Sequence, residues 1–390
     1  MCSGLRYDFI TTANLISMLD YLFSFDPGLI GYLVFLIVSV AIYGIFSLGL
    51  NLQWGYTGLI NFGHVAFMTV GAYTTSLLTL SGTPIFIAVM IGAFLAAFLG
   101  LLMGFSTLRL REDYLSIVTI GVSELVRLFA LNEDWLTKGA FGVQDFPLPL
   151  SQFRPTVGTR IGMIAIVAPI FGFIIWKLAQ QLIQRFRKRQ TVGAIFSVIL
   201  ILLTVRLLTV TAIALYDYSS NQARNGLLFL SLITVAIVYW ALERLVHSPW
   251  GRVLKAIRED EQVAIALGKN VFLYKLQSLM LGGFIAGIAG AFFAWQLSTV
   301  YPTNFEPIVT FQAWIIMILG GAGNNAGTLL GAGIYWAYTA FTRDLERILP
   351  LGADQIGAMR IMLIGLILMV LMLFRPQGIL GNKDELTLGK

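Results

Sequence analysis

The chain of 390 residues is 57% hydrophobic and only 12% charged, with a mean hydropathy of +0.82. A soluble globular surface needs roughly twice that share of charged side chains, so these values exclude an ordinary soluble protein. The net charge of +6 comes without basic clusters that carry a stacking platform, so we expect no nucleic-acid partner.

Many apolar runs approach or exceed the roughly 20 residues that a helix needs to cross the hydrocarbon core of a bilayer. The sequence therefore predicts an all-α, polytopic membrane protein embedded in lipid. The predicted spans 308–320 and 327–342 could instead form one long hairpin with the sequence GGAGNN at its tip. In chain order the predicted spans lie near 28–50, 57–80, 84–108, 114–131, 160–177, 191–215, 226–245, 276–298, 308–320, 327–342 and 356–374.

Three parts follow from this pattern: an N-terminal segment at 1–27, a transmembrane domain at 28–376 and a cytoplasmic tail at 377–390. Residues 1–25 do not resemble a cleaved signal, because Asp8, Asn14 and Asp20 interrupt any apolar core.

Lysine and arginine predict the orientation, since cytoplasmic loops carry an excess of both. Even numbers of predicted spans separate four basic clusters, so all four are expected in the cytoplasm, with the amino terminus outside and the carboxyl terminus inside. The clusters are Arg109 with Arg111; Lys177 with Arg185, Arg187, Lys188 and Arg189; the stretch 249–276; and Arg375 with Lys383.

A first glycine-rich region, NLQWGYTGLINFGHVAFMTVGAY at 51–73, contains Asn51, Gln53, Asn61 and His64. Amide and imidazole groups at membrane depth are costly unless they bond to neighbouring helices or line a wet cavity. The region is thus a candidate for a broken helix beside a translocation path. The alternative is that these side chains only hydrogen-bond adjacent helices.

Glu124 and Arg127 are charged residues within the predicted span 114–131. Because they stand three residues apart, they can pair on one helix face. We expect a structural ion pair, with substrate or ion binding as the alternative.

The stretch PWGRVLKAIREDEQVAIALGKNVFLYKL at 249–276 is a charged island between apolar spans. Apolar residues alternate with its charges at helical spacing, and Gly268 then favours a stop. We expect an amphipathic helix, a glycine break and re-entry into the bilayer, which together would form a cytoplasmic loop at 246–275 that docks a soluble partner.

A second glycine-rich region shows small residues four apart, namely Gly283 with Gly287, and Gly323 with Gly327 and Gly331. Each set is expected on one helix face, where it lets another backbone approach closely. We predict tight helix packing there, including contacts with another membrane subunit.

Catalytic chemistry is missing from the sequence. Gly268-Lys269 lacks the rest of a phosphate-binding loop, and with only His64, His247 and Cys2 a catalytic metal site is not expected. No serine or cysteine nucleophile has a histidine in a recognisable arrangement. We therefore expect no enzyme activity and no cofactor, but a conduit driven from outside itself or by an ion gradient.

Four stretches resemble the LivM-type permease subunits of ABC importers for branched-chain and other hydrophobic amino acids, most closely the Nat-type neutral amino-acid permeases. They are Asn51-Leu52 with GLINFGHVAF and GAY, SPWGRVLKAIREDEQVAIALG at 248–268, GGAGNNAGTLLGA at 320–332 and FRPQGILG at 374–381. The resemblance implies that the segment near 261–268 couples to an ATPase. The residues it implicates are Arg258, Glu259, Asp260, Glu261, Ala264, Leu267 and Gly268.

The resemblance also implies the rest of an inner-membrane transporter: a LivH-type permease partner, two ATP-hydrolysing subunits and a periplasmic binding protein. It favours neutral or branched-chain amino acids as substrates, with urea or short amides second. A secondary transporter acting alone is a competing class, which predicts more ionisable residues at the bilayer midplane and an internal repeat.

One segment, 177–224, departs from the shorter family members by carrying a basic stretch and the extra apolar run 191–215. It is expected to be either an added peripheral helix pair or a sign that the neighbouring spans are shifted.

Overall fold

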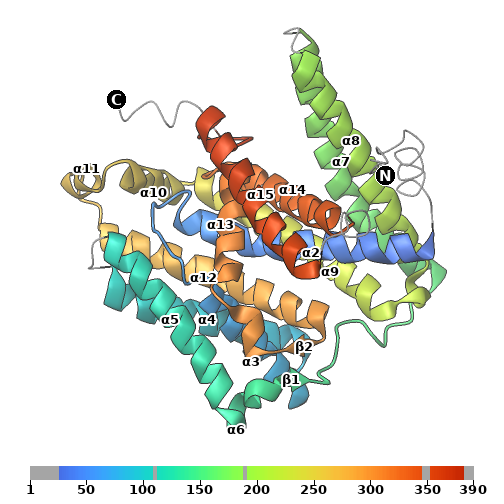
Figure 1. The fold of residues 1–390 in the computed structure, drawn as a ribbon, viewed down its shortest axis with the longest axis horizontal. Helices are drawn as coiled ribbons and strands as arrows, with labels where there is room; N and C mark the ends of the chain where they lie inside the picture. Colours follow the sequence, from blue (N-terminus) through green and yellow to red (C-terminus); the bar gives the residue numbers. More distant parts are fainter. Residues whose placement is uncertain (1–25, 109–111, 188–190, 345–351, 382–390) are drawn as a thin grey trace, which may run out of the picture. The chain divides into compact units, whose positions relative to one another are not determined.

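The computed structural model describes residues 26–108, 112–187, 191–344 and 352–381, which are almost entirely helical (Figure 1). The predicted all-α, multi-pass fold is confirmed. Several residues used to predict the ends and the orientation of the chain lie outside the described residues: those before 26, Arg109, Arg111, Lys188, Arg189 and Lys383.

Eight helices in the described part of the chain are long and apolar enough to cross a membrane. Each falls on one of the predicted spans. They are α2 (Pro27–Gln53), α4 (Ile85–Thr107), α5 (Glu112–Asn132), α7 (Val157–Arg187), α8 (Thr191–Tyr216), α9 (Gln222–His247), α12 (Val271–Leu297) and α15 (Ala353–Phe374).

The other three predicted spans fall on α3 (Val65–Leu80), α13 (Ile308–Gly320) and α14 (Asn325–Asp344). At ~1.5 Å per residue, α3 with 16 residues and α13 with 13 are about 24 and 20 Å long, less than the roughly 30 Å of a hydrocarbon core. The expected span at 57–80 is wrong in its first part, because residues 57–64 are not helical. The chain bends by 116° between α13 and α14, which corresponds to the hairpin alternative.

The chain divides into two compact units, Met1–Phe35 with Thr156–Tyr218, and Leu36–Pro155 with Ser219–Lys390, here called unit 1 and unit 2. In unit 2, α12 packs against α3 and α4 (Figure 1). Glycines make this packing close: a Cβ atom built on Gly71 would lie 2.1 Å from the carbonyl oxygen of Gly287, and one on Gly287 would lie 2.8 Å from Cβ of Ala96. The backbones of these helices therefore touch.

Helices α13 and α14 use glycine in the same way. A Cβ on Gly331 would lie 2.0 Å from the carbonyl oxygen of Ile316, and one on Gly327 would lie 2.6 Å from that of Gly320. Gly323 is not part of this face, because it lies in the turn before α14 with φ +74°. The predicted placement of Gly323 on one helix face with Gly327 and Gly331 is therefore wrong, and the close approaches at Gly327 and Gly331 are made within this chain.

Short elements follow α5 and α12. The chain after α5 forms α6 (Asp134–Thr137), η1 (Gly139–Phe141) and β1 (Val143–Gln144), and the chain after α12 forms β2 (Thr299–Val300) and η3 (Pro302–Phe305). Strands β1 and β2 pair antiparallel, with Val143 opposite Val300. The carboxyl ends of α5 and α12 therefore lie at the same end of unit 2.

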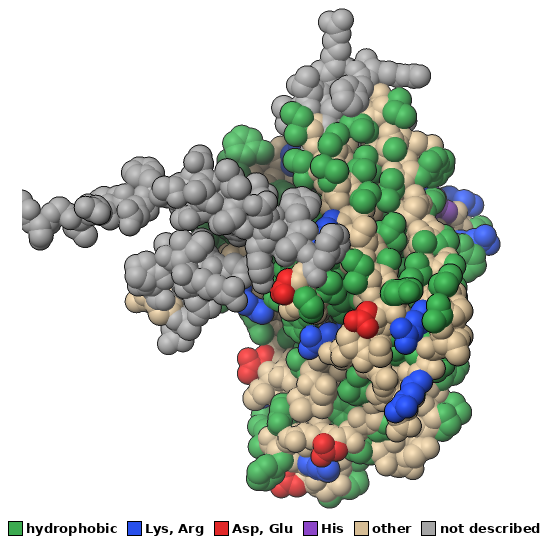
Figure 2. All heavy atoms as spheres, turned by 90° about the vertical axis from the view of Figure 1, so that its right-hand side faces the viewer, with side chains coloured by type: hydrophobic (Ala, Val, Ile, Leu, Met, Phe, Trp, Pro, Cys, Tyr) green, Lys and Arg blue, Asp and Glu red, His purple; other side chains and the backbone are tan. Residues whose placement is uncertain are grey.

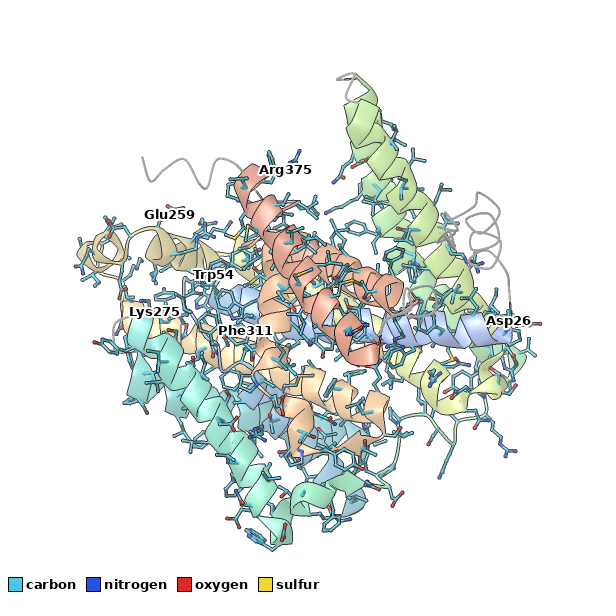
Figure 3. The ribbon with its side chains drawn as sticks, in the orientation of Figure 1. Asp26, Trp54, Glu259, Lys275, Phe311 and Arg375 are labelled. Carbon is cyan, nitrogen blue, oxygen red and sulfur yellow. The ribbon has the colours of Figure 1, made fainter. Side chains whose placement is uncertain are left out.

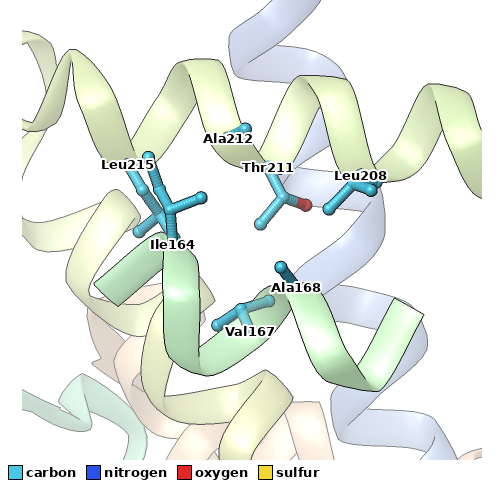
Figure 4. A pocket seen from close by; sticks show the side chains of 7 residues that line it. All are labelled: Ile164, Val167, Ala168, Leu208, Thr211, Ala212 and Leu215. Atoms are coloured by element: carbon cyan, nitrogen blue, oxygen red, sulfur yellow. The ribbon is translucent and has the colours of Figure 1, made fainter. Parts of the chain in front are cut away.

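Unit 1 contains the helical hairpin of α7 and α8, which pack against each other, and the chain continues into η2 (Tyr218–Ser220). Arg160 on α7 donates a hydrogen bond to the carbonyl of Tyr216 at 2.9 Å. Between the two helices lies a small apolar hollow (Figure 4), lined by Ile164, Val167, Ala168, Leu208, Thr211, Ala212 and Leu215. The extra apolar run is thus the second helix of a hairpin with α7.

The surface is strongly apolar. Hydrophobic side chains cover much of the face drawn in Figure 2, with few charged side chains between them. Phe86 on α4 is 76% exposed and Leu373 on α15 is 77% exposed. Such patches mark contact with lipid or with another membrane subunit.

Candidate functional site

Two short helices follow α9. Helix α10 (Pro249–Glu259) begins after Ser248, whose side chain accepts a hydrogen bond from the Gly251 N–H, and Pro249 occupies the first helical position. Asp260 ends α10 and caps α11 (Glu261–Ala266), because its Oδ1 accepts from the N–H groups of Gln262 at 2.8 Å and Val263 at 3.1 Å. Local capping therefore explains why the chain forms two helices that are separated by the extended residue Asp260.

The chain returns to the bundle at a glycine. Gly268 has φ +74°, a left-handed conformation that glycine adopts without steric cost. Asn270 then caps α12 by accepting from the Leu273 N–H at 3.2 Å. The predicted helix and glycine break are present, with two helices where one was expected, and the candidate membrane span α12 follows them. Residues 249–268 are called the docking segment below, after the role that the family resemblance implies for them.

A small core holds the docking segment to α12. Ile257, Ala264 and Val271 are buried against one another, and Val253 and Tyr274 pack around them. An ion pair adds to this contact, since Lys275 Nζ lies 2.6 Å from Glu261 Oε2.

Other side chains of α11, and Leu267 directly after it, are exposed. Val263, Ile265 and Leu267 are 53%, 50% and 71% exposed, although they are apolar. Glu259 and Asp260 are exposed next to them, and Figure 3 shows Glu259 on α10 and Lys275 near the start of α12. Of the residues implicated in coupling, Glu259, Asp260, Leu267 and Gly268 are thus exposed, whereas Ala264 is buried and Glu261 faces Lys275.

Arg258 differs from both groups. It is half-buried, and its Nη1 donates a hydrogen bond to the carbonyl oxygen of Gly55, in the break between α2 and α3. Its side chain therefore points toward the bundle.

The break itself, residues 54–64, is held by polar side chains. Gln53 Nε2 donates to the carbonyl of Leu279 on α12 at 3.2 Å, and Gln53 Oε1 accepts from Asn61 Nδ2 at 2.9 Å. Trp314 on α13 donates from Nε1 to the Asn61 carbonyl at 3.1 Å, and its ring also contacts the ring of Trp54 (Trp54 is labelled in Figure 3). Gln53 and Asn61 thus hydrogen-bond neighbouring elements, as in the second sequence-based interpretation.

A series of hydrogen bonds that begins at Asn51 joins three helices. Its Nδ2 donates to Asn325 Oδ1 at 3.1 Å, and its Oδ1 accepts from the Gly323 N–H at 2.9 Å. Asn325 Nδ2 in turn donates to Glu243 Oε1 on α9 at 3.1 Å. Asn51 and Asn325 are buried, so these hydrogen bonds link α2, α14 and α9 inside the bundle.

His64 packs among aromatic rings. It is fully buried, its Nε2 lies 3.2 Å from the Phe46 carbonyl, and its ring centre is 4.7 Å from that of Phe46 and 5.6 Å from that of Phe67. Nδ1 has no hydrogen-bond partner among the described residues. The contacts of His64 are those of helix packing.

The end of the chain after α15 also reaches this region. Ile379 and Leu380 donate backbone hydrogen bonds to the carbonyls of Leu319 at 3.1 Å and Gly320 at 2.9 Å. Asn324 Nδ2 donates to the Leu380 carbonyl at 2.7 Å. The stretch at 377–381 is therefore fixed to the turn between α13 and α14.

The four stretches that carry the family resemblance thus meet at one place in unit 2. We call it the junction; it comprises residues 51–58, 320–325, 377–381, Glu243, Lys255 and Arg258. Sequence reasoning missed Glu243 and Asn325. Asn325 could have been found from the sequence, because two adjacent asparagines stand there in an apolar region. Glu243 could not, because Arg244 and His247 beside it make the whole end of the helix polar.

Glu124 and Arg127 on α5 form the expected pair. Arg127 Nε donates to Glu124 Oε2 at 2.9 Å, and Nη2 donates to Oε1. No group of three or more histidine, cysteine or acidic residues able to hold a metal ion occurs among the described residues.

Comparison with known proteins gives a family match over most of the chain. A family model described as "Branched-chain amino acid transport system / permease component" matches residues 32–373. The high-affinity branched-chain amino acid transport system permease protein LivM of Escherichia coli (strain K12) is 28% identical over 340 residues, 87% of this chain and 68% of that protein.

Two further relatives widen the comparison. A probable LivM of Methanocaldococcus jannaschii is 25% identical, over 89% of this chain and 92% of that protein. The nucleoside ABC transporter permease protein NupC of Lactococcus lactis subsp. cremoris is 23% identical, over 73% of each. No solved structure matches.

Proposed function

Because the chain belongs to the family of branched-chain amino acid transport system permease components, we propose that it translocates neutral or branched-chain amino acids as one half of a permease pair. It is a multi-pass inner-membrane protein and an import permease subunit of the ABC type. Its expected partners are a LivH-type permease, two ATPase subunits and a periplasmic binding protein. The observation that carries the proposal is a family match over 32–373 that includes the docking segment.

The proposed class of substrate is based on the names of the relatives. The LivM proteins that match this chain are named for branched-chain amino acids, whereas NupC, with a lower identity, is named for nucleosides. Urea and short amides are a further alternative. Amino acids come first because the family description and the two LivM relatives agree.

The exposed apolar residues Val263, Ile265 and Leu267 support an ATPase partner at the docking segment. Apolar side chains on a short helix that projects from a membrane protein fit a hydrophobic groove on a soluble subunit. Glu259 and Asp260 add charges at the edge of this surface, where they favour orientation more than affinity.

One substitution tests the docking surface. Leu267→Asp places a charge at the most exposed apolar position of this surface, and we expect co-purification of the ATPase subunits and leucine uptake to fall by more than tenfold, because a buried apolar anchor contributes about 2 kcal/mol or more to an interface. Gln262→Ala, an exposed polar neighbour on α11, should leave both unchanged. Normal uptake by Leu267→Asp would contradict the proposal that this surface docks the ATPase.

The class of transporter and its substrate are tested together. In vesicles that contain the permease pair, both ATPases and the binding protein, labelled leucine should accumulate only with ATP, and uridine or urea should not compete. Uphill transport by this chain alone without nucleotide would instead indicate a secondary transporter.

A further inference from the structure

The docking segment and the break lie against each other. Arg258 donates to the Gly55 carbonyl, which stands just past the end of α2, where helix carbonyls lose their intrahelical partners. The stem of the same side chain covers Gly58, where a Cβ atom would lie 3.4 Å from Arg258 Cγ. Lys255 Nζ lies 5.6 Å from the centre of the Tyr56 ring. Helix α10 therefore rests on the turn 54–58.

Gly55 in turn touches the next element of the junction. A Cβ atom on Gly55 would lie 2.5 Å from the Gly323 nitrogen and 2.1 Å from Asn51 Oδ1. Asn51 continues through its hydrogen bonds to Asn325 on α14, and Asn325 continues to Glu243 on α9. A shift of Gly55 toward these atoms would therefore press on Asn51 and Gly323.

We propose that Arg258 is a positioning residue that passes movement of the docking segment to Gly55 and hence to α2 and the turn between α13 and α14. This inference rests on the proposed function, because it assumes that ATPase subunits move the docking segment. Protein interiors are close-packed and transmit displacement. The charge-assisted hydrogen bond from Arg258 to the Gly55 carbonyl opposes separation of α10 from the turn 54–58. Their direct packing opposes closer approach. Movement of α10 in either direction is therefore passed to Gly55.

The role differs from the one that the sequence implied for Arg258. A residue that binds the ATPase would present its guanidinium on the exposed side of the segment, beside Glu259 and Leu267. Instead Arg258 is half-buried and bonded to Gly55. The docking segment is thus divided between an outer side for the partner and an inner side for the bundle.

The test compares Arg258→Ala and Arg258→Lys with the matched control Arg252→Ala in the complete transporter. Arg252 is exposed on the same helix, and its Nη1 reaches the His247 carbonyl at 3.5 Å. Three quantities are measured: ATPase subunits that co-purify, ATP hydrolysed, and solute moved per ATP. The last quantity separates transmission from a loss of folded protein, which would lower hydrolysis and transport in proportion.

We expect Arg258→Ala to keep its ATPase subunits and its ATP hydrolysis while the solute moved per ATP falls by roughly tenfold, the scale of one charge-assisted hydrogen bond. Arg258→Lys, which keeps a charged donor of shorter reach, should lie between this value and the wild type. Arg252→Ala, on the exposed side of the same helix, should move the same amount of solute per ATP as the wild type.

Other results would overturn the proposal. Loss of the ATPase subunits from Arg258→Ala would make Arg258 a docking contact, and an unchanged ratio of transport to hydrolysis would make it structural or dispensable. If Arg258→Ala fails to assemble, Arg258→Lys decides, because a wild-type ratio there contradicts the link. Failure of the proposed function would be seen separately, in a wild-type complex that does not transport leucine.

Discussion

Hydrogen bonds between side chains far apart in sequence determine how the break between α2 and α3 is held. Asn51 and Asn325 are separated by 274 residues, and Gln53 bonds to the Leu279 carbonyl across 226 residues. The sequence showed that amides at membrane depth need partners, but it offered no means of identifying them. Glu124 and Arg127, only three residues apart on one helix, were by contrast predictable as a pair.

For Glu261, the structure gives a new reason why reversing its charge should lower uptake. The docking role implied by the family predicts that reversing its charge abolishes uptake. In the structure Glu261 pairs with Lys275 at 2.6 Å, with side chains 44% and 12% exposed. The carboxylate therefore connects α11 to α12.

Exchanging the charges of Glu261 and Lys275 distinguishes a contact with the ATPase from an ion pair within this chain. Glu261→Lys places two cations side by side and should lower leucine uptake, whereas Glu261→Lys with Lys275→Glu restores the attraction and should recover most of that loss. The coupling of a partly exposed pair is about 1 kcal/mol or less, so a severalfold recovery is expected in a double-mutant cycle. If the double variant stays as inactive as the single one, Glu261 acts on a partner protein instead.

At the scale of elements, glycines decide how closely the helices of unit 2 pack. The predicted four-residue spacing at Gly283 and Gly287 falls on α12, where α4 passes at contact distance. Gly71 on α3 proved equally close to α12, although its spacing had not marked it as a packing residue.

Matched alanine substitutions test this packing. Gly71→Ala would place a methyl group 2.1 Å from the Gly287 carbonyl oxygen, so α3 and α12 must separate. Overpacking of this kind costs roughly 1–3 kcal/mol, and we expect a lower melting temperature in detergent and less folded protein in the membrane.

Gly121→Ala is the control, because Gly121 lies in α5 with nothing within 4 Å of its Cβ position. Alanine favours a helix over glycine by about 1 kcal/mol, so this variant should melt no lower than the wild type. Equal melting temperatures for both variants would contradict the close contact between α3 and α12.

The positions of the long helices were predictable, and the breaks were less so. Hydropathy identified all eight long spans, since each is a continuous apolar run. The same averaging extended a predicted span across 57–64, because Leu59, Ile60 and Phe62 are apolar although the chain there is not helical. Backbone conformation at Gly58, with φ +80°, is not visible in an average of hydrophobicity.

For the whole molecule, the paired strands and the docking segment define two ends of unit 2. Strands β1 and β2 follow α5 and α12 and pair with each other, while α12 begins next to the docking segment and has 27 residues, about 40 Å at ~1.5 Å per residue. One crossing by α12 therefore separates the loop after α5 from the docking segment.

The chain must then cross the membrane an odd number of times between that loop and the docking segment. Helices α7, α8 and α9 are three candidate membrane spans, and three crossings satisfy the requirement. A hairpin such as α7 and α8 returns to its starting side, so the two helices together leave the orientation of the later helices unchanged.

Thiol labelling tests this arrangement in a Cys2→Ser background, which removes the one native cysteine. Trp135→Cys lies in the loop after α5, where the native side chain is 79% exposed, and Lys269→Cys lies at an exposed position directly after the docking segment. A membrane-impermeant reagent should label Trp135→Cys from the periplasmic side and Lys269→Cys only in inside-out vesicles, because basic loops stay in the cytoplasm. The background protein without an added cysteine should remain unlabelled. If both cysteines react from the same side, an even number of crossings separates them, and either α7, α8 or α9 does not span the bilayer.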